Sequence, residues 1–96
     1  MNQTMMNYFK AFADENRLKI IELLIKGETC GCTLIDQLSI SQPTLSYHLK
    51  QIEQAGLATT KREGNLIKYT INRDKLNEMM EYLQQLRDMK EAPCEI

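Results

Sequence analysis

The 96-residue sequence is short of cysteine, of long apolar runs and of positive charge, and each shortage excludes a class of protein. Its three cysteines are an odd number without framework spacing, which argues against a disulfide scaffold and for a reducing cytoplasm. Residues 1–12 lack the apolar core of a signal peptide. No membrane span is expected, because Lys19, Glu22 and Lys26 interrupt the most apolar helix. We therefore expect a cytoplasmic protein with no membrane partner.

The net charge of −1 is unusual for a nucleic-acid binder, so the distribution of charge matters more than its sum. Residues 57–71 carry three bases against one acid, whereas residues 74–91 carry five acids against three bases. Positive charge is therefore local, and DNA would have to meet the middle of the chain.

Length and composition predict one small globular domain over residues 1–96, with 43% apolar and 26% charged residues. A domain of this size buries a limited fraction of its surface. Dimerisation would bury further surface and stabilise the folded state, and we expect a homodimer.

Residues 29–57 have the spacing of a helix-turn-helix: a short helix, a tight turn opening at Ser39, and a second, longer helix. The Ser41 hydroxyl can cap the second helix, and Pro43 fits its first turn, where a missing N–H costs little. Gly56 ends it.

The second helix of this unit has two unlike sides. Leu45, Leu49 and Ile52 fall on one, with His48 at its margin, and we interpret His48 as a packing or hydrogen-bonding residue. The other side is polar with almost no acid, which suits base edges and phosphates in a major groove, although a solvated helix face would look the same. The predicted DNA contacts on it are Gln42, Pro43, Thr44, Ser46, Tyr47 and Lys50.

Two helices precede this unit. An apolar stripe with helical spacing predicts a first helix that ends near Ala13: Met5, Met6, Phe9, Phe12 and Ala13. Asp14 can cap a second helix, which buries Leu18, Ile21, Leu24 and Ile25 and closes at Gly27.

After the unit, residues 57–62 and 66–71 predict two short strands joined by residues 63–65, a β-hairpin wing. Lys61, Arg62 and Lys68 on this wing can reach phosphates or a minor groove. The alternative is that the charges only keep a surface hairpin soluble.

Asn72 or Asp74 starts a last helix whose apolar stripe continues beyond what one small core requires. We infer that the first and last helices form a two-fold interface. Pro93 is expected to end the order, and residues 92–96 are expected to be a flexible tail. The predicted fold is mainly α, an α+β winged helix-turn-helix of about five helices in the order ααααββα. The predicted dimer-interface residues are Met5, Phe9, Phe12, Met79, Leu83 and Leu86.

Cys30 and Cys32 flank Gly31 at the entrance to the helix-turn-helix. Thiolates prefer soft ions. In an ideal helix, positions i and i+2 point about 200° apart and cannot grip one ion, whereas an extended backbone brings them to one side. Ligation by both sulfurs should therefore reshape this turn and the helix that follows. A redox switch and plain packing are the alternatives for the pair.

The segments Glu28–Leu34 and Ser41–Leu49 resemble the ArsR/SmtB family of metal-sensing bacterial repressors, especially its arsenic-responsive members, and the likeness runs from about Phe9 to Leu83. The resemblance implies a dimeric repressor that leaves operator DNA when Cys30 and Cys32 capture As(III) or Sb(III), with no permanent cofactor. Some members carry a third cysteine where this chain has Ile35, so a three-sulfur site would have to recruit Cys94 from either chain.

Other readings remain open beside this one. The family's zinc sensors use a histidine and carboxylates on the last helix, yet His48 is the only histidine, and the residues before Phe12 lack the cysteines of the cadmium and lead type. The runner-up is nevertheless a winged-helix regulator that responds to Cd, Pb or thiol oxidation. An interaction module using the acidic last helix is a non-DNA alternative. An enzyme is disfavoured, because no third group orients a cysteine and His48.

Overall fold

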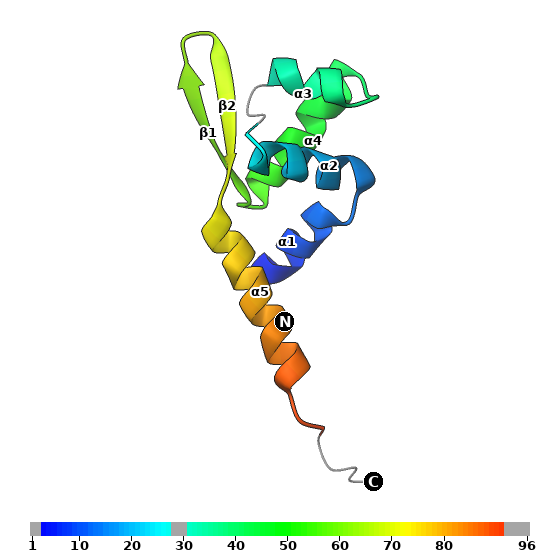
Figure 1. Cartoon of the computed structure of the whole chain (residues 1–96), viewed down its shortest axis with the longest axis vertical. Coiled ribbons are helices and arrows are strands. Elements are labelled where there is room, and N and C mark those ends of the chain that lie inside the picture. The colour runs from blue at the N-terminus through cyan, green and yellow to red at the C-terminus, as the bar shows by residue number, and fades with distance from the viewer. Residues whose placement is uncertain (1–2, 28–30, 92–96) are drawn as a thin grey trace.

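The computed structural model describes residues 3–27 and 31–91, which form five helices and one two-stranded antiparallel hairpin (Figure 1). The predicted order ααααββα is confirmed. The elements are α1 Gln3–Phe12, α2 Glu15–Ile25, α3 Gly31–Gln37, α4 Gln42–Gln54, β1 Ala58–Glu63, β2 Leu66–Ile71 and α5 Arg73–Asp88. Glu63 belongs to β1 and pairs with Leu66, so the hairpin loop is the two-residue Gly64-Asn65 rather than the three residues predicted.

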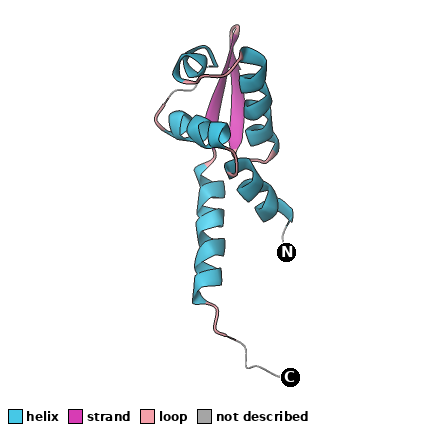
Figure 2. Ribbon diagram, turned by 90° about the vertical axis from the view of Figure 1, so that its right-hand side faces the viewer, coloured by secondary structure: helices cyan, strands magenta, loops and turns pink. Residues whose placement is uncertain are grey.

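The described chain has a compact body and a protruding helix. Helices α1 to α4 and the hairpin lie together, and α5 extends away from them, with α1 beside part of its length and its C-terminal end beside no other described element (Figures 1 and 2). The principal extents of 61 × 24 × 21 Å record the same elongation. A single chain therefore leaves much of α5 uncovered.

The core lies where α1, α2, α3 and α4 meet the base of the hairpin. As predicted, α4 buries Leu45, Leu49 and Ile52, and it buries His48 as well. The largest fully buried side chains come from each of these elements and from the residue before β1: Tyr8, Ile20, Leu34, Leu45, Ile52 and Leu57.

The faces of α1 and α2 are rotated from the predicted ones. In α1 the core takes Tyr8 and Ala11, while Phe9 and Phe12 are only partly buried. In α2 the core takes the predicted Ile21 and Leu24 and also Ile20, whereas the predicted Leu18 and Ile25 are exposed. When the apolar stripe of a helix is wider than the surface it packs against, the sequence does not show which edge of the stripe is buried.

Side-chain caps begin three of the helices, each as its sequence indicates. Asp14 accepts a hydrogen bond from the Arg17 backbone N–H at 3.1 Å, which is the largest reason that the pKa of Asp14 is lowered. Ser41 accepts one from the Thr44 N–H at 3.4 Å. Asn72 caps α5 by accepting from the Asp74 N–H at 3.1 Å, which decides between the two predicted starts.

Candidate nucleic-acid interface

The polar side of α4 is the surface that a DNA groove would meet. Of its predicted contacts, Thr44 is half-buried and the others are exposed: Gln42, Pro43, Ser46, Tyr47 and Lys50. Because the opposite side is sealed in the core, α4 can present only this face. It offers amide, hydroxyl, phenol and ammonium groups, the donors and acceptors that base edges and phosphates require.

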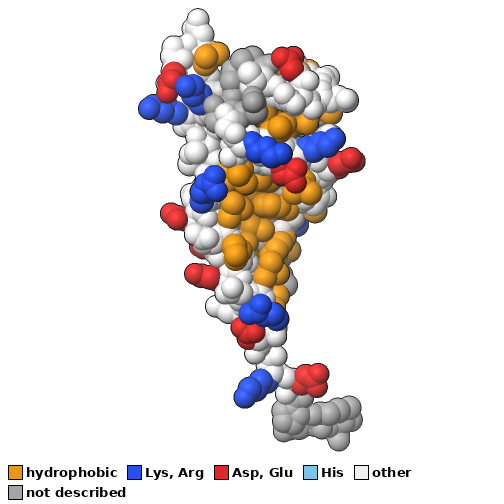
Figure 3. Space-filling view, viewed as in Figure 1, with side chains coloured by type: hydrophobic (Ala, Val, Ile, Leu, Met, Phe, Trp, Pro, Cys, Tyr) orange, Lys and Arg blue, Asp and Glu red, His pale blue; other side chains and the backbone are white. Residues whose placement is uncertain are grey.

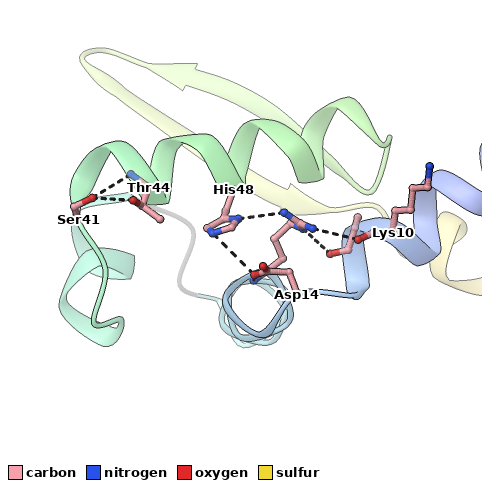
Figure 4. Close-up of polar contacts among 7 residues, drawn as sticks. Lys10, Asp14, Ser41, Thr44 and His48 are labelled. Carbon is pink, nitrogen blue, oxygen red and sulfur yellow. Dashed lines mark hydrogen bonds and ion pairs between the residues drawn. The ribbon is translucent and has the colours of Figure 1, made fainter.

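Thr44 is held in place by the residue that caps its helix. The Ser41 hydroxyl donates to Thr44 Oγ1 at 2.9 Å, in addition to accepting from the Thr44 N–H (Figure 4). The Thr44 hydroxyl keeps its own proton for an outside acceptor. The cap therefore fixes the start of α4 and also orients one of its polar groups.

The hairpin divides the three predicted wing bases between its two faces. Lys61 lies directly opposite Lys68, whereas Arg62 lies opposite Ile67. Because side chains alternate along a strand, Lys61 and Lys68 share one face. Arg62 lies on the other, the face that carries the buried Ala58 at its base.

The Glu63 carboxylate offsets part of the positive charge on the face that carries Lys61 and Lys68. Its carboxylate lies 2.9 Å from Lys68 Nζ and 3.9 Å from Lys61 Nζ. Within residues 3–27 and 31–91, no ion pair is found for Arg62. Arg62 is thus the wing base whose charge is not offset by a close carboxylate.

We expect Glu63→Gln to raise DNA affinity about two- to fivefold, because exposed ion pairs of this kind are each worth at most about 1 kcal/mol. Freed lysines should also steepen the fall of affinity with salt, by up to about 0.9 in the log–log slope for each new phosphate contact. Fluorescence anisotropy over a salt series measures both. Glu81→Gln on α5 changes the net charge equally and is the matched control; an equal gain there would show a non-specific charge effect.

A hydrogen bond joins α4 to the wing. The Thr60 hydroxyl donates to Glu53 Oε2 at 2.9 Å. Tyr69, opposite Thr60, has its pKa raised by burial and, to a lesser extent, by the Glu53 carboxylate. The orientation of the wing relative to α4 is therefore fixed by side chains that the sequence did not single out.

The predicted dimer residues divide into buried and uncovered groups. Met5 and Met79 belong to the chain's own core, and Phe9 and Phe12 are partly buried beside it. The Phe9 ring lies 6.0 Å from that of Tyr82, which ties α1 to α5.

The uncovered group lies on α5. Leu83 and Leu86 are 51% and 44% exposed, and Met80 and Met89, which are not among the predicted interface residues, are exposed as well. Figure 3 shows apolar side chains gathered over the region of α1 and α5. An exposed apolar surface of this kind marks an interaction site.

The cysteine site lies largely outside the described residues. Cys30 and Cys94 are outside them, as is the side chain of Cys32. Helix α3 begins at Gly31, between the first two cysteines in sequence. In the part of the chain that is described, no group of three histidine, cysteine or acidic side chains could hold a metal ion. In the same part, no helix is long and apolar enough to cross a membrane.

Comparisons with known proteins agree with this arrangement. The family model "Bacterial regulatory protein, arsR family" matches residues 14–60. The chain is 39% identical over 80 residues to the arsenical resistance operon repressor of Staphylococcus xylosus, covering 83% of this chain and 73% of the relative. It is 35% identical over 75 residues to the cadmium resistance transcriptional regulatory protein CadC of Listeria innocua, covering 77% and 63%.

Among solved structures, the homodimeric winged helix-turn-helix DNA-binding domain of Mb0332 from Mycobacterium bovis matches with a TM-score of 0.71. The two are 26% identical over 88% of this chain and 79% of that one. These relatives are transcriptional regulators and not enzymes, as predicted. The chain belongs to the ArsR family and is a winged-helix transcriptional repressor.

Proposed function

We propose that this repressor binds operator DNA as a homodimer in the cytoplasm and releases it when As(III) or Sb(III) binds the thiolates of Cys30 and Cys32. The observation that carries the DNA-binding half is the exposed polar face of α4 beside a basic wing. In a two-fold dimer the two α4 helices would enter successive major grooves, roughly 34 Å apart. The arsenical relative supports the choice of inducer.

The start of α3 supports the release mechanism. Cys32 lies in α3, which is described from Gly31 onward, and Cys30 is outside the described residues. A shared ion needs both sulfurs on one side, and a continuous helix would separate them. Metal capture is therefore expected to distort the first turn of α3.

A distortion of α3 has a direct route to α4. Leu34 of α3 and Leu45 of α4 are both fully buried in one core, and the two helices pack together. Thiolate-rich sites can contribute on the order of 10 kcal/mol, whereas allosteric release needs only about 1–3 kcal/mol. A small difference between the DNA-bound and free shapes is sufficient.

Cys94 is our proposed third sulfur, from the same chain or its partner. As(III) and Sb(III) are soft ions that take thiolate ligands, and the position that carries a third cysteine in some family members is Ile35 here. Cys94→Ser should therefore weaken the metalloid response without abolishing it. An unchanged response would remove Cys94 from the site.

The test is release of a selected operator fragment, followed by anisotropy, against As(III), Sb(III), Cd(II), Pb(II) and Zn(II). We expect As(III) and Sb(III) to release the wild type, and the double variant Cys30→Ser/Cys32→Ser to bind DNA normally and ignore both. Arsenite release of the double variant would contradict the mechanism.

A second candidate is a repressor that responds to Cd(II), Pb(II) or thiol oxidation, and the cadmium relative favours keeping it. The metal series above separates the ions. Release by peroxide in metal-free buffer, with Cys30 and Cys32 oxidised, would identify the redox form.

A further inference from the structure

Arg17 lies in α2 and its guanidinium contacts both α1 and α4, and the proposed function assigns it no role. From α2, its Nε donates to the Ala11 carbonyl at 3.1 Å and its Nη2 to the Lys10 carbonyl at 3.3 Å, which satisfies the end of α1. Its Nη1 contacts His48 Nδ1 in α4 at 3.3 Å. Figure 4 draws these contacts as dashed lines that run from His48 to the Arg17 side chain and from there to the backbone at Lys10.

The contact with Arg17 assigns the tautomer of His48. A guanidinium has donors and no acceptor, so in this contact Arg17 Nη1 donates and His48 Nδ1 accepts, which fits the tautomer with its proton on Nε2. His48 Nε2 lies 3.9 Å from Asp14 Oδ1, so a proton on Nε2 faces a carboxylate oxygen. The His48 side chain is 8% exposed, so water has little access to replace either contact.

A surface hollow lies between α1 and α4 on the side of Arg17. It has a volume of about 250 Å³ and is lined by Asn7 and Lys10 from α1, by Gln51 and Gln54 from α4, and by Arg17. Helices α1 and α4 each pack on α2, and on the side of this hollow Arg17 bonds to both of them. Its hydrogen bonds therefore add a constraint on the angle between α1 and α4.

We propose that Arg17 is a positioning residue for DNA binding: it fixes α4 relative to α1 by holding His48 in one tautomer. The inference rests on the proposed function, because α1 is also linked to the dimer face through Phe9 and Tyr82. The angle between α1 and α4 then sets the distance between the two α4 helices of a dimer and their orientation toward the DNA.

We expect Arg17→Gln and His48→Gln each to weaken operator binding about tenfold, the loss typical of one charge-assisted hydrogen bond. The double variant should be little worse than either single variant, because both changes break the same link. The salt slope should stay unchanged, since Arg17 contacts no phosphate. Arg73→Gln, an exposed arginine on α5, is the matched control and should bind as the wild type.

The ¹⁵N spectrum of the imidazole gives a readout independent of DNA. His48 is the only histidine, so the wild type should show one ring protonated at Nε2, and Arg17→Gln should show a mixture of tautomers. Protonation at Nδ1 in the wild type, additive losses in the double variant, or a flatter salt slope for Arg17→Gln would overturn the proposal. If Arg17→Gln fails to fold, the wild-type spectrum and the salt slope of His48→Gln still decide. A wild type that shows the expected tautomer but binds no DNA would refute the proposed function instead.

Discussion

Replacing Leu83 with glutamate is expected to convert the protein to monomers and to weaken operator binding at least about 100-fold. Leu83 is 51% exposed in a single chain, so the change should leave the fold of the chain intact. In a dimer that buries this face, an unpaired carboxylate would cost several kcal/mol, and each 1.4 kcal/mol is about a factor of ten. A monomer also presents only one α4 helix and one wing.

Analytical ultracentrifugation across protein concentrations, paired with operator anisotropy, measures both effects. Gln85→Glu is the matched control, because it adds the same charge one residue from Leu86 but on the polar side of α5. It should remain dimeric and bind normally. A Leu83→Glu protein that stays dimeric, with circular dichroism showing a folded chain, would place the interface elsewhere.

The elements of the fold could be predicted because their signals are local. Asp14 and Ser41 begin their helices by bonding to a backbone N–H three residues on, and the alternation of residues 66–71 suits a strand. The inner face of α4 was also readable, since Leu45, Leu49 and Ile52 have no competing apolar stripe on the same helix. Local patterns therefore placed both the fold and the surface of α4.

What could not be predicted depends on tertiary placement. The offset of Lys68 by Glu63 requires the hairpin register, and the link from Arg17 to His48 joins residues 31 apart in sequence. Tyr8 was missed for a related reason. Its ring is buried and its hydroxyl donates to Glu78 of α5 at 3.4 Å, a partner 70 residues away. Single-helix periodicity carries no information about such partners.

Leu45→Ala is expected to cost about 2–5 kcal/mol of the free energy of unfolding, the range for removing a buried leucine side chain from a well-packed core. Leu45 is 0% exposed in the core and belongs to the helix that presents the proposed DNA-binding face. A domain of this size has only about 5–15 kcal/mol in total, so the variant should unfold at a markedly lower urea concentration.

Leu66→Ala is the control for that change, because it removes the same atoms from a wing residue that is 47% exposed. Its free energy of unfolding should fall by less than about 1 kcal/mol, since little apolar surface is lost from the core there. Both variants should be unfolded in urea at one fixed protein concentration, because dimerisation stabilises the folded state by mass action. Equal losses for the two leucines would mean that Leu66 is covered in the assembled protein. The wing tip, and not only α5, would then belong to an interface between chains.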